Sequence, residues 1–96
     1  MNRIRLDELM IMYENEFYLE TSFDKDCDGH RLIIVNFFDI KNENVSYFSL
    51  WCKWHPKKNE IEYDESMFER NLNWARQTMR RNRMKRKMYR IKKDFE

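Results

Sequence analysis

The hydrophobic pattern of this chain changes from a strand-like to a helix-like period near residue 64, and this change constrains the fold most. Residues 16–24 alternate large apolar side chains with polar ones, and residues 31–40 and 45–54 are equally rich in aromatic and β-branched types. Such segments predict β-strands, because these side chains suit a pleated, half-buried surface. Residues 60–63 are a candidate for a further, short edge strand. We therefore expect an antiparallel sheet of three or four strands within residues 16–63.

Two other segments have a helical period. Residues 5–14 place apolar side chains at i, i+3, i+4 and i+7, which predicts a short helix. Residues 64–93 predict a long helix, and the apolar stripe that should dock on the sheet consists of Phe68, Leu72, Ala75 and Met79. A later stripe, formed by Met84, Met88, Ile91 and Phe95, starts about 100° away around the helix. The second half of the helix should therefore project from the sheet, bend, or pack on something else.

The start of the long helix has two interpretations. Ser66 and Glu69 have the spacing of a capping box, in which the two side chains satisfy free backbone N–H groups of the first turn. Alternatively, Asp64 is the capping residue and Tyr63 packs against Phe68 as a hydrophobic staple. Both interpretations place the first helical turn just after the sheet.

Together these segments predict a single α+β domain over residues 1–96, with the long basic helix packed on the sheet. A chain of 96 residues can bury one modest core, to which its aromatic residues contribute much. No apolar run approaches the roughly 18 residues of a membrane span, and the first residues lack the hydrophobic stretch of a signal peptide. We expect a cytoplasmic protein whose two cysteines are reduced or bind a metal.

The single glycine of the chain lies in the segment DKDCDGHR, residues 24–31, between the first two predicted strands. Asp28-Gly29 is typical of a two-residue hairpin turn, because glycine adopts a positive φ readily and aspartate tolerates it. This turn pairs residue 17 with 40, 23 with 34 and 27 with 30, and the next hairpin then pairs 34 with 51, 38 with 47 and 30 with 55. In this register Trp51 and Tyr47 face the core, Trp74 lies near the docking stripe, and Trp54 is the most exposed tryptophan.

The same segment has part of the pattern of an EF-hand calcium loop. The carboxylates and the glycine occupy loop positions 1, 3, 5 and 6, which are Asp24, Asp26, Asp28 and Gly29. The loop also needs a bidentate glutamate at position 12, where this chain has Val35, and an aliphatic residue at position 8, where it has Arg31. We therefore interpret the three aspartates as a solvated strand end.

All cysteines and histidines of the chain fall in two Cys-x-x-His units, residues 27–30 and 52–55. Thiolate and imidazole ligands in a set of four suit a structural zinc ion, and the candidate ligands are Cys27, His30, Cys52 and His55. One observation opposes this site, because strict alternation places Cys52 on the face of its strand opposite to His55. The alternative is two buried thiols and two surface histidines near a turn.

Charge is distributed unevenly along the chain. Residues 1–79 hold ten Lys and Arg against 15 Asp and Glu, whereas residues 80–96 hold nine against two, so an acidic body precedes a basic tail. The nine cations are Arg80, Arg81, Arg83, Lys85, Arg86, Lys87, Arg90, Lys92 and Lys93. Such a helix favours contact with nucleic acid or with a nucleic-acid-binding protein complex. The alternatives are pairing with the acidic body, a solubilising role, and a helix on a membrane surface, and of these we expect no membrane partner.

Catalytic motifs are missing from the sequence, which has no glycine-rich phosphate loop and no recognisable nucleophile and base. A metal-dependent nuclease built on His30 and His55 is therefore disfavoured, and we expect a non-enzymatic binding protein that uses the basic segment. Phe, Tyr, Met, Ile, Asn and Lys, whose codons are AT-rich, supply 44 of the 96 residues, as in many low-GC bacteria and their phages. One hypothesis is thus an anti-CRISPR-like inhibitor of a host RNA-guided defence nuclease. The alternatives are a zinc-stabilised DNA- or RNA-binding regulator and a homo-oligomerisation module, for example a homodimer, that pairs the second apolar stripe between chains.

Overall fold

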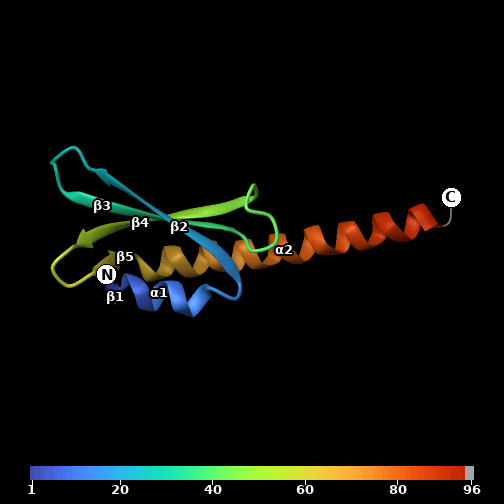
Figure 1. Cartoon of the computed structure of the whole chain (residues 1–96), viewed down its shortest axis with the longest axis horizontal. Coiled ribbons are helices and arrows are strands. Elements are labelled where there is room, and N and C mark those ends of the chain that lie inside the picture. The colour runs from blue at the N-terminus through green and yellow to red at the C-terminus, as the bar shows by residue number, and fades with distance from the viewer. Residues whose placement is uncertain (95–96) are drawn as a thin grey trace.

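The computed structural model describes the backbone of residues 1–94 and the side chains of residues 1–83. The strands of this part of the chain are β1 (Asn2–Arg5), β2 (Phe17–Lys25), β3 (Arg31–Asp39), β4 (Ser46–His55) and β5 (Glu60–Tyr63). The helices are α1 (Leu6–Tyr13) and α2 (Glu65–Asp94). The strands form one antiparallel sheet in the order β1-β5-β4-β3-β2, and both helices lie on the same side of it (Figure 1). The predicted α+β class is confirmed.

The sheet has five strands rather than three or four, because the residues before α1 form β1 and pair with β5. The segment Asn2–Arg5 contains one apolar residue, Ile4, so its sequence carries no strand pattern of its own. Ile4 pairs with the buried Ile61 of β5, and this long-range contact makes the segment a strand. As a result β5, predicted to be an edge strand, lies inside the sheet.

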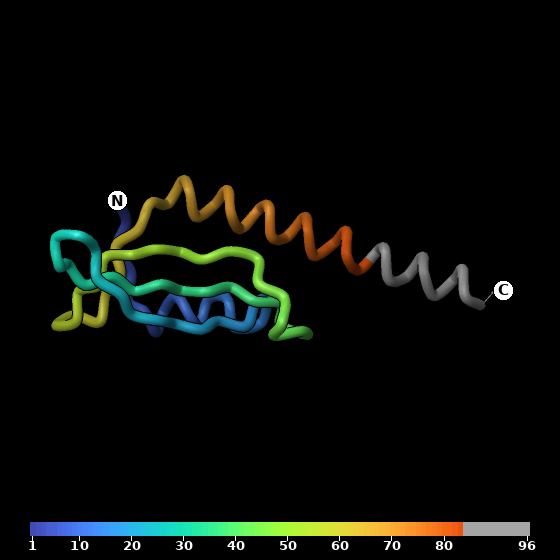
Figure 2. The backbone as a smooth tube through the Cα atoms, turned by 90° about the horizontal axis from the view of Figure 1, so that it is seen from above, coloured from blue at the N-terminus to red at the C-terminus, as the bar shows by residue number. Residues whose placement is uncertain are grey.

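The core lies between the sheet and the two helices, with Phe37 of β3 at its centre. Four aromatic rings contact Phe37 with 4.4 to 6.1 Å between ring centroids: Tyr13, Phe17, Phe48 and Phe68. They come from α1, β2, β4 and α2 in that order, so one side chain joins both layers. Seen from above, α2 starts alongside β4 and α1 lies beneath β2 and β3 (Figure 2).

α2 begins as the second interpretation of its start predicted. The Asp64 carboxylate accepts a hydrogen bond from the backbone N–H of Met67 at 3.2 Å. The rings of Tyr63 and Phe68 meet edge to face with 5.5 Å between their centroids. Asp64 is therefore the capping residue, and Tyr63 and Phe68 form the staple. The predicted docking stripe is confirmed, because all four of its side chains are buried.

The hairpin between β2 and β3 has a three-residue loop, residues 27–29, in place of the predicted two-residue turn. It is closed by Asp26, whose backbone N–H donates to the carbonyl of His30 at 3.1 Å. The Asp26 carboxylate accepts the N–H groups of Asp28 and His30, which stabilises the longer loop. Gly29 takes the positive φ of 83° that completes this type of turn.

The longer loop shifts the pairing of β2 with β3 by one residue, so the predicted register is wrong. Phe17 pairs with Asp39 and Phe23 with Ile33, where the prediction had residues 40 and 34. A shift of one residue turns the opposite face of a strand inward. The buried side chains of β3 are therefore Ile33, Val35 and Phe37, while Ile34 and Phe38, which the prediction placed in the core, lie half-buried on the outer face.

The predicted pairing of β3 with β4 is correct from Leu32 with Lys53 to Phe37 with Phe48, which includes Ile34 with Trp51. A bulge after Phe37 pairs Phe38 with Ser46 instead of Tyr47. Tyr47 is buried, as expected. Trp51, however, lies on the outer face of the sheet, opposite to its predicted side.

The exposure of the three tryptophans reverses the prediction. Trp51 and Trp74 are 59% and 54% exposed, whereas Trp54, predicted to be the most exposed, is half-buried against the core. The reversal for Trp51 and Trp54 follows from the register, because the two lie on opposite faces of β4.

Candidate functional site

The basic segment begins on the part of α2 that faces the end of α1. Arg76, Arg80 and Arg83 are spaced i, i+4 and i+7, so they share one face of the helix. They line a hollow of about 560 Å³ together with Met12 of α1 and Ile40, which follows β3. Arginines thus form one wall of the hollow, and apolar side chains contribute to the rest. We call this surface the arginine hollow.

Arg76 joins the two sides of the arginine hollow. Its Nε donates to both carboxylate oxygens of Glu16, at 2.8 and 3.2 Å, and Glu16 lies in the turn between α1 and β2. This hydrogen bond raises the pKa of Arg76. Because Glu16 neutralises Arg76, the excess positive charge of the hollow comes from Arg80 and Arg83.

Asp39 positions the loop that brings Ile40 to the hollow. Burial raises the pKa of Asp39, but the hydrogen bond from the Tyr47 hydroxyl, those from the backbone N–H groups of Lys41 and Asn42, and the nearby charge of Arg83 outweigh it. The net result is a lowered pKa, so the carboxylate is ionised at neutral pH. Its hydrogen bonds hold the start of the β3–β4 loop in place beside α2.

Arg80, Arg81 and Arg83 are exposed, and none forms an ion pair or a hydrogen bond with another residue whose side chain is described. In the body, Arg3, Lys53 and Arg76 pair with glutamates, whereas other exposed cations such as Lys25 and Arg31 form no ion pair with a described side chain either. The other predicted partner-binding residues lie outside the described side chains: Lys85, Arg86, Lys87, Arg90, Lys92 and Lys93. The second apolar stripe, from Met84 to Phe95, lies outside them too.

The four candidate zinc ligands are not brought together. Cys27 is exposed in the hairpin loop, whereas Cys52 is buried in the core, where desolvation raises the pKa of its thiol to about 12. Zinc binds the thiolate, which such a pKa disfavours. His30 Nδ1 is 3.3 Å from an Asp26 oxygen, and His55 Nε2 is 4.0 Å from one of Glu62. Zinc binding stays a prediction that would require β4 to rearrange, and metal analysis of protein purified without chelator would test it.

Among the described residues, one group of metal-ligating atoms lies within 4.8 Å of one another, that of Asp26, Asp28 and His30. The hairpin accounts for this cluster, because the Asp26 carboxylate accepts backbone N–H groups of the loop that it closes. The hydrogen bond from the His30 backbone is the main cause that lowers the pKa of Asp26, and burial opposes it. The cluster is thus explained by the turn itself.

The parts of the arginine hollow outside the basic segment were not predicted from the sequence. Met12, Ile40 and Glu16 come from segments that only the tertiary fold brings to α2. Arg76 could have been found, because its spacing to Arg80 and Arg83 continues the same helical face.

Comparisons with known protein families, with curated proteins and with solved structures find no match. No helix within the described residues is both long and apolar enough to cross a membrane. Fold and site therefore define a class only in structural terms, a small α+β protein with an arginine hollow. Its function has to be argued from geometry and charge.

Proposed function

We propose that this protein is a non-enzymatic binding protein that contacts nucleic acid, free or within a nucleoprotein, through the basic face of α2. The observation that supports this is the exposure of Arg80, Arg81 and Arg83, none of which forms an ion pair or hydrogen bond with a described side chain, although the charge of Arg83 is felt by Asp39. The guanidinium group presents a planar set of donors that matches phosphate oxygens, and it remains charged at all physiological pH values. Six further cations follow in the sequence before residue 94.

The arrangement of charge argues against a purely internal role for this segment. If the basic segment served to pair with the acidic body, its first turns should already contact carboxylates. Among the described residues of α2, the ion pair to the body is that of Arg76 with Glu16, four residues before the segment starts. The carboxylate of Glu62 is paired with Arg3 and Lys53 of the body instead.

A more specific form of the proposal is an anti-CRISPR-like inhibitor that contacts a host RNA-guided nuclease where that complex holds its nucleic acid. Small size and AT-rich coding support this form, and so does a basic helix that continues past the docking stripe in sequence. It implies action in the cytoplasm of a host cell.

Nucleic-acid binding can be measured by fluorescence anisotropy with labelled single-stranded RNA and duplex DNA. We expect binding at about 50 mM salt that weakens steeply by about 200 mM, because phosphate contacts release counterions. The triple variant Arg80→Glu, Arg81→Glu, Arg83→Glu should lose most of this affinity. If residual binding is measurable, its salt slope should fall by about three, roughly one for each lost phosphate contact.

A matched control variant reverses the charge of three exposed cations elsewhere by the substitutions Lys57→Glu, Lys58→Glu and Arg70→Glu. It changes the net charge by the same amount, so it separates a specific surface from a general charge effect. We expect the control to keep the affinity within about threefold, apart from long-range attraction that salt screens. No anisotropy change at low salt, or an equal loss in both triple variants, would contradict the proposal.

A further inference from the structure

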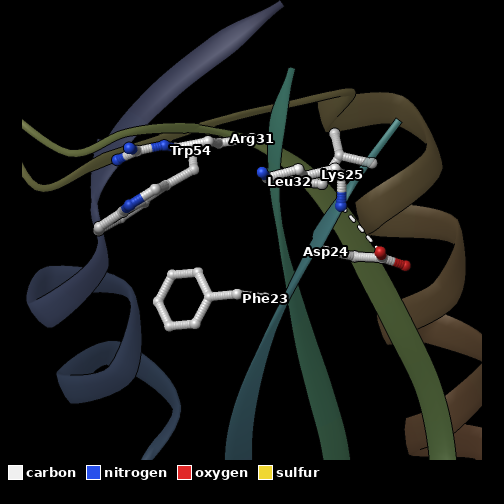
Figure 3. A pocket seen from close by; sticks show the side chains of 6 residues that line it. All are labelled: Phe23, Asp24, Lys25, Arg31, Leu32 and Trp54. Atoms are coloured by element: carbon white, nitrogen blue, oxygen red, sulfur yellow. Dashed lines mark hydrogen bonds between the residues drawn. The ribbon is translucent and has the colours of Figure 1, made fainter. Parts of the chain in front are cut away.

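A second hollow, of about 470 Å³, lies at the other end of β3. It forms where β2 ends, β3 begins and β4 approaches its last residue, and its lining is Phe23, Asp24, Lys25, Arg31, Leu32 and Trp54 (Figure 3). The nine residues of β3 span about 30 Å, so this hollow is well separated from Ile40 and the arginine hollow. Its volume falls in the range typical of small-ligand sites.

Two aromatic rings form a corner of this hollow. Phe23 and Trp54 have 5.8 Å between their ring centroids and an angle of 66° between their planes. Phe23 is 65% exposed, although it lies on the same face of the sheet as the core. In this corner a planar ligand can stack on one ring while its edge meets the other.

Two cations stand beside the aromatic corner. Lys25 and Arg31 pair across β2 and β3, so both project on the face that carries Phe23. Neither forms an ion pair with another residue whose side chain is described. Asp24 is the acid of this lining, and one of its oxygens accepts the Lys25 backbone N–H at 2.8 Å (Figure 3). The lining thus combines stacking surface with a net charge of +1.

We infer that this hollow binds a nucleotide unit, with the base stacked in the corner of Phe23 and Trp54 and the phosphate held by Arg31 and Lys25. Aromatic side chains stack on bases of any sequence, and arginine beside them binds the attached phosphate. The unit can be a free mononucleotide or an unpaired nucleotide of a single strand. The site uses no residue of the basic face of α2, so it stands or falls independently of that surface.

The test uses the full chain and two-dimensional ¹H–¹⁵N NMR spectra, in which each of its three tryptophans gives an indole N–H signal. Titration with 5′-AMP should move the Trp54 signal in a saturable way, while Trp51 on the outer face should not move. Adenosine and inorganic phosphate, each carrying half of the ligand chemistry, should bind more weakly than AMP. The signals are assigned by the variants Trp54→Phe and Trp51→Phe.

Two variants test the assigned roles. Phe23→Leu keeps an apolar side chain but removes the ring, and Arg31→Gln removes the charge. Phe23→Leu should weaken AMP binding about fivefold or more, the lower limit expected for loss of one stacking contact. Arg31→Gln should also weaken it, because the phosphate loses a charged hydrogen-bond donor. Trp51→Phe, at an exposed position on the opposite face, should bind AMP like the native protein. Because Phe23 and Arg31 are exposed, thermal melting should show these variants folded.

A second titration replaces AMP by a single-stranded oligothymidine. It uses the variant in which Arg80, Arg81 and Arg83 are all replaced by glutamate. A shift of Trp54 with AMP alone identifies a free nucleotide as the ligand, and a shift with the oligonucleotide alone identifies an unpaired nucleotide of a strand. Because the basic face is disabled here, a shift of Trp54 cannot come from oligonucleotide that binds at that face, and the AMP titration tests the hollow whether or not the basic face binds nucleic acid. If neither ligand moves Trp54, or if Phe23→Leu binds AMP as tightly as the native protein, the inference is overturned.

Discussion

The two cysteine side chains have opposite surroundings. Cys27 is exposed in the β2–β3 loop, whereas Cys52 is 2% exposed and its Sγ lies 3.6 Å from the carbonyl oxygen of Leu50. Burial raises the pKa of the Cys52 thiol to about 12, because a thiolate in the apolar core would lose its hydration. At neutral pH Cys52 is therefore a neutral thiol that packs like a small apolar side chain.

We predict that a thiol reagent such as Ellman's reagent labels one cysteine of the native protein rapidly and the other only as the protein unfolds. At pH 8 the thiolate fraction of Cys52 should be on the order of a thousandfold below that of an ordinary thiol. The rapid phase should vanish in Cys27→Ser and persist in Cys52→Ser. Two rapid phases in the native protein would contradict the buried position of Cys52.

α2 connects the core to the proposed binding surface. Phe68, Leu72 and Ala75 bury its first turns against the sheet, and Met79 is buried where the arginine hollow begins. The position of the arginines along this helix therefore depends on how its N-terminus is held. Asp64 does this by satisfying the N–H of Met67, one of the donors that a helix start leaves without a partner.

Loss of this cap should destabilise the protein without disturbing the core. We expect Asp64→Ala to lower the free energy of unfolding by about 1 kcal/mol, the usual value for a lost capping side chain. Asp64→Asn retains a capping oxygen and should cost much less. Urea unfolding followed by circular dichroism measures both. Equal losses for Ala and Asn would show that the charge of Asp64, and not its hydrogen bond, stabilises the helix start.

The whole molecule depends on a single core that lies on one face of the sheet. Phe37 joins the two layers through its ring contacts, while Phe23, on the same face, lies beyond the packed core and is 65% exposed. The two phenylalanines have the same chemistry and sit on neighbouring strands. They form a matched pair for measuring how much of the stability comes from the core.

We predict that Phe37→Ala lowers the free energy of unfolding by about 3–5 kcal/mol, because it removes apolar contacts and leaves a cavity. Phe23→Ala should change it by less than about 1 kcal/mol. Chemical denaturation gives both values. If Phe37→Ala is unfolded from the outset, Phe37→Leu should show a smaller loss of the same sign. Similar losses for Phe23→Ala and Phe37→Ala would contradict the placement of the core.

Local pattern was enough to predict α1, the strands β2 to β5, the start of α2 and its docking stripe. Each depends on periodicity or on groups a few residues apart, as with Asp64, Tyr63 and Phe68. The run of cations in residues 80–93 likewise includes two of the arginines that line the arginine hollow, Arg80 and Arg83. These features need no knowledge of what lies opposite them in space.

The register of β2 with β3 depended on the geometry of the loop between them, and the composition of both hollows depended on the tertiary fold. β3 is apolar on both faces, so its pattern could not show whether Ile33 or Ile34 points inward, and the Asp26 loop settled this by adding one residue. The face of Trp51 and the meeting of Phe23 with Trp54 followed from that register. β1 became a strand only because β5 pairs with it. The register was set by hydrogen bonds within the loop and β1 by a partner distant in sequence, and a hydrophobic period encodes neither of these.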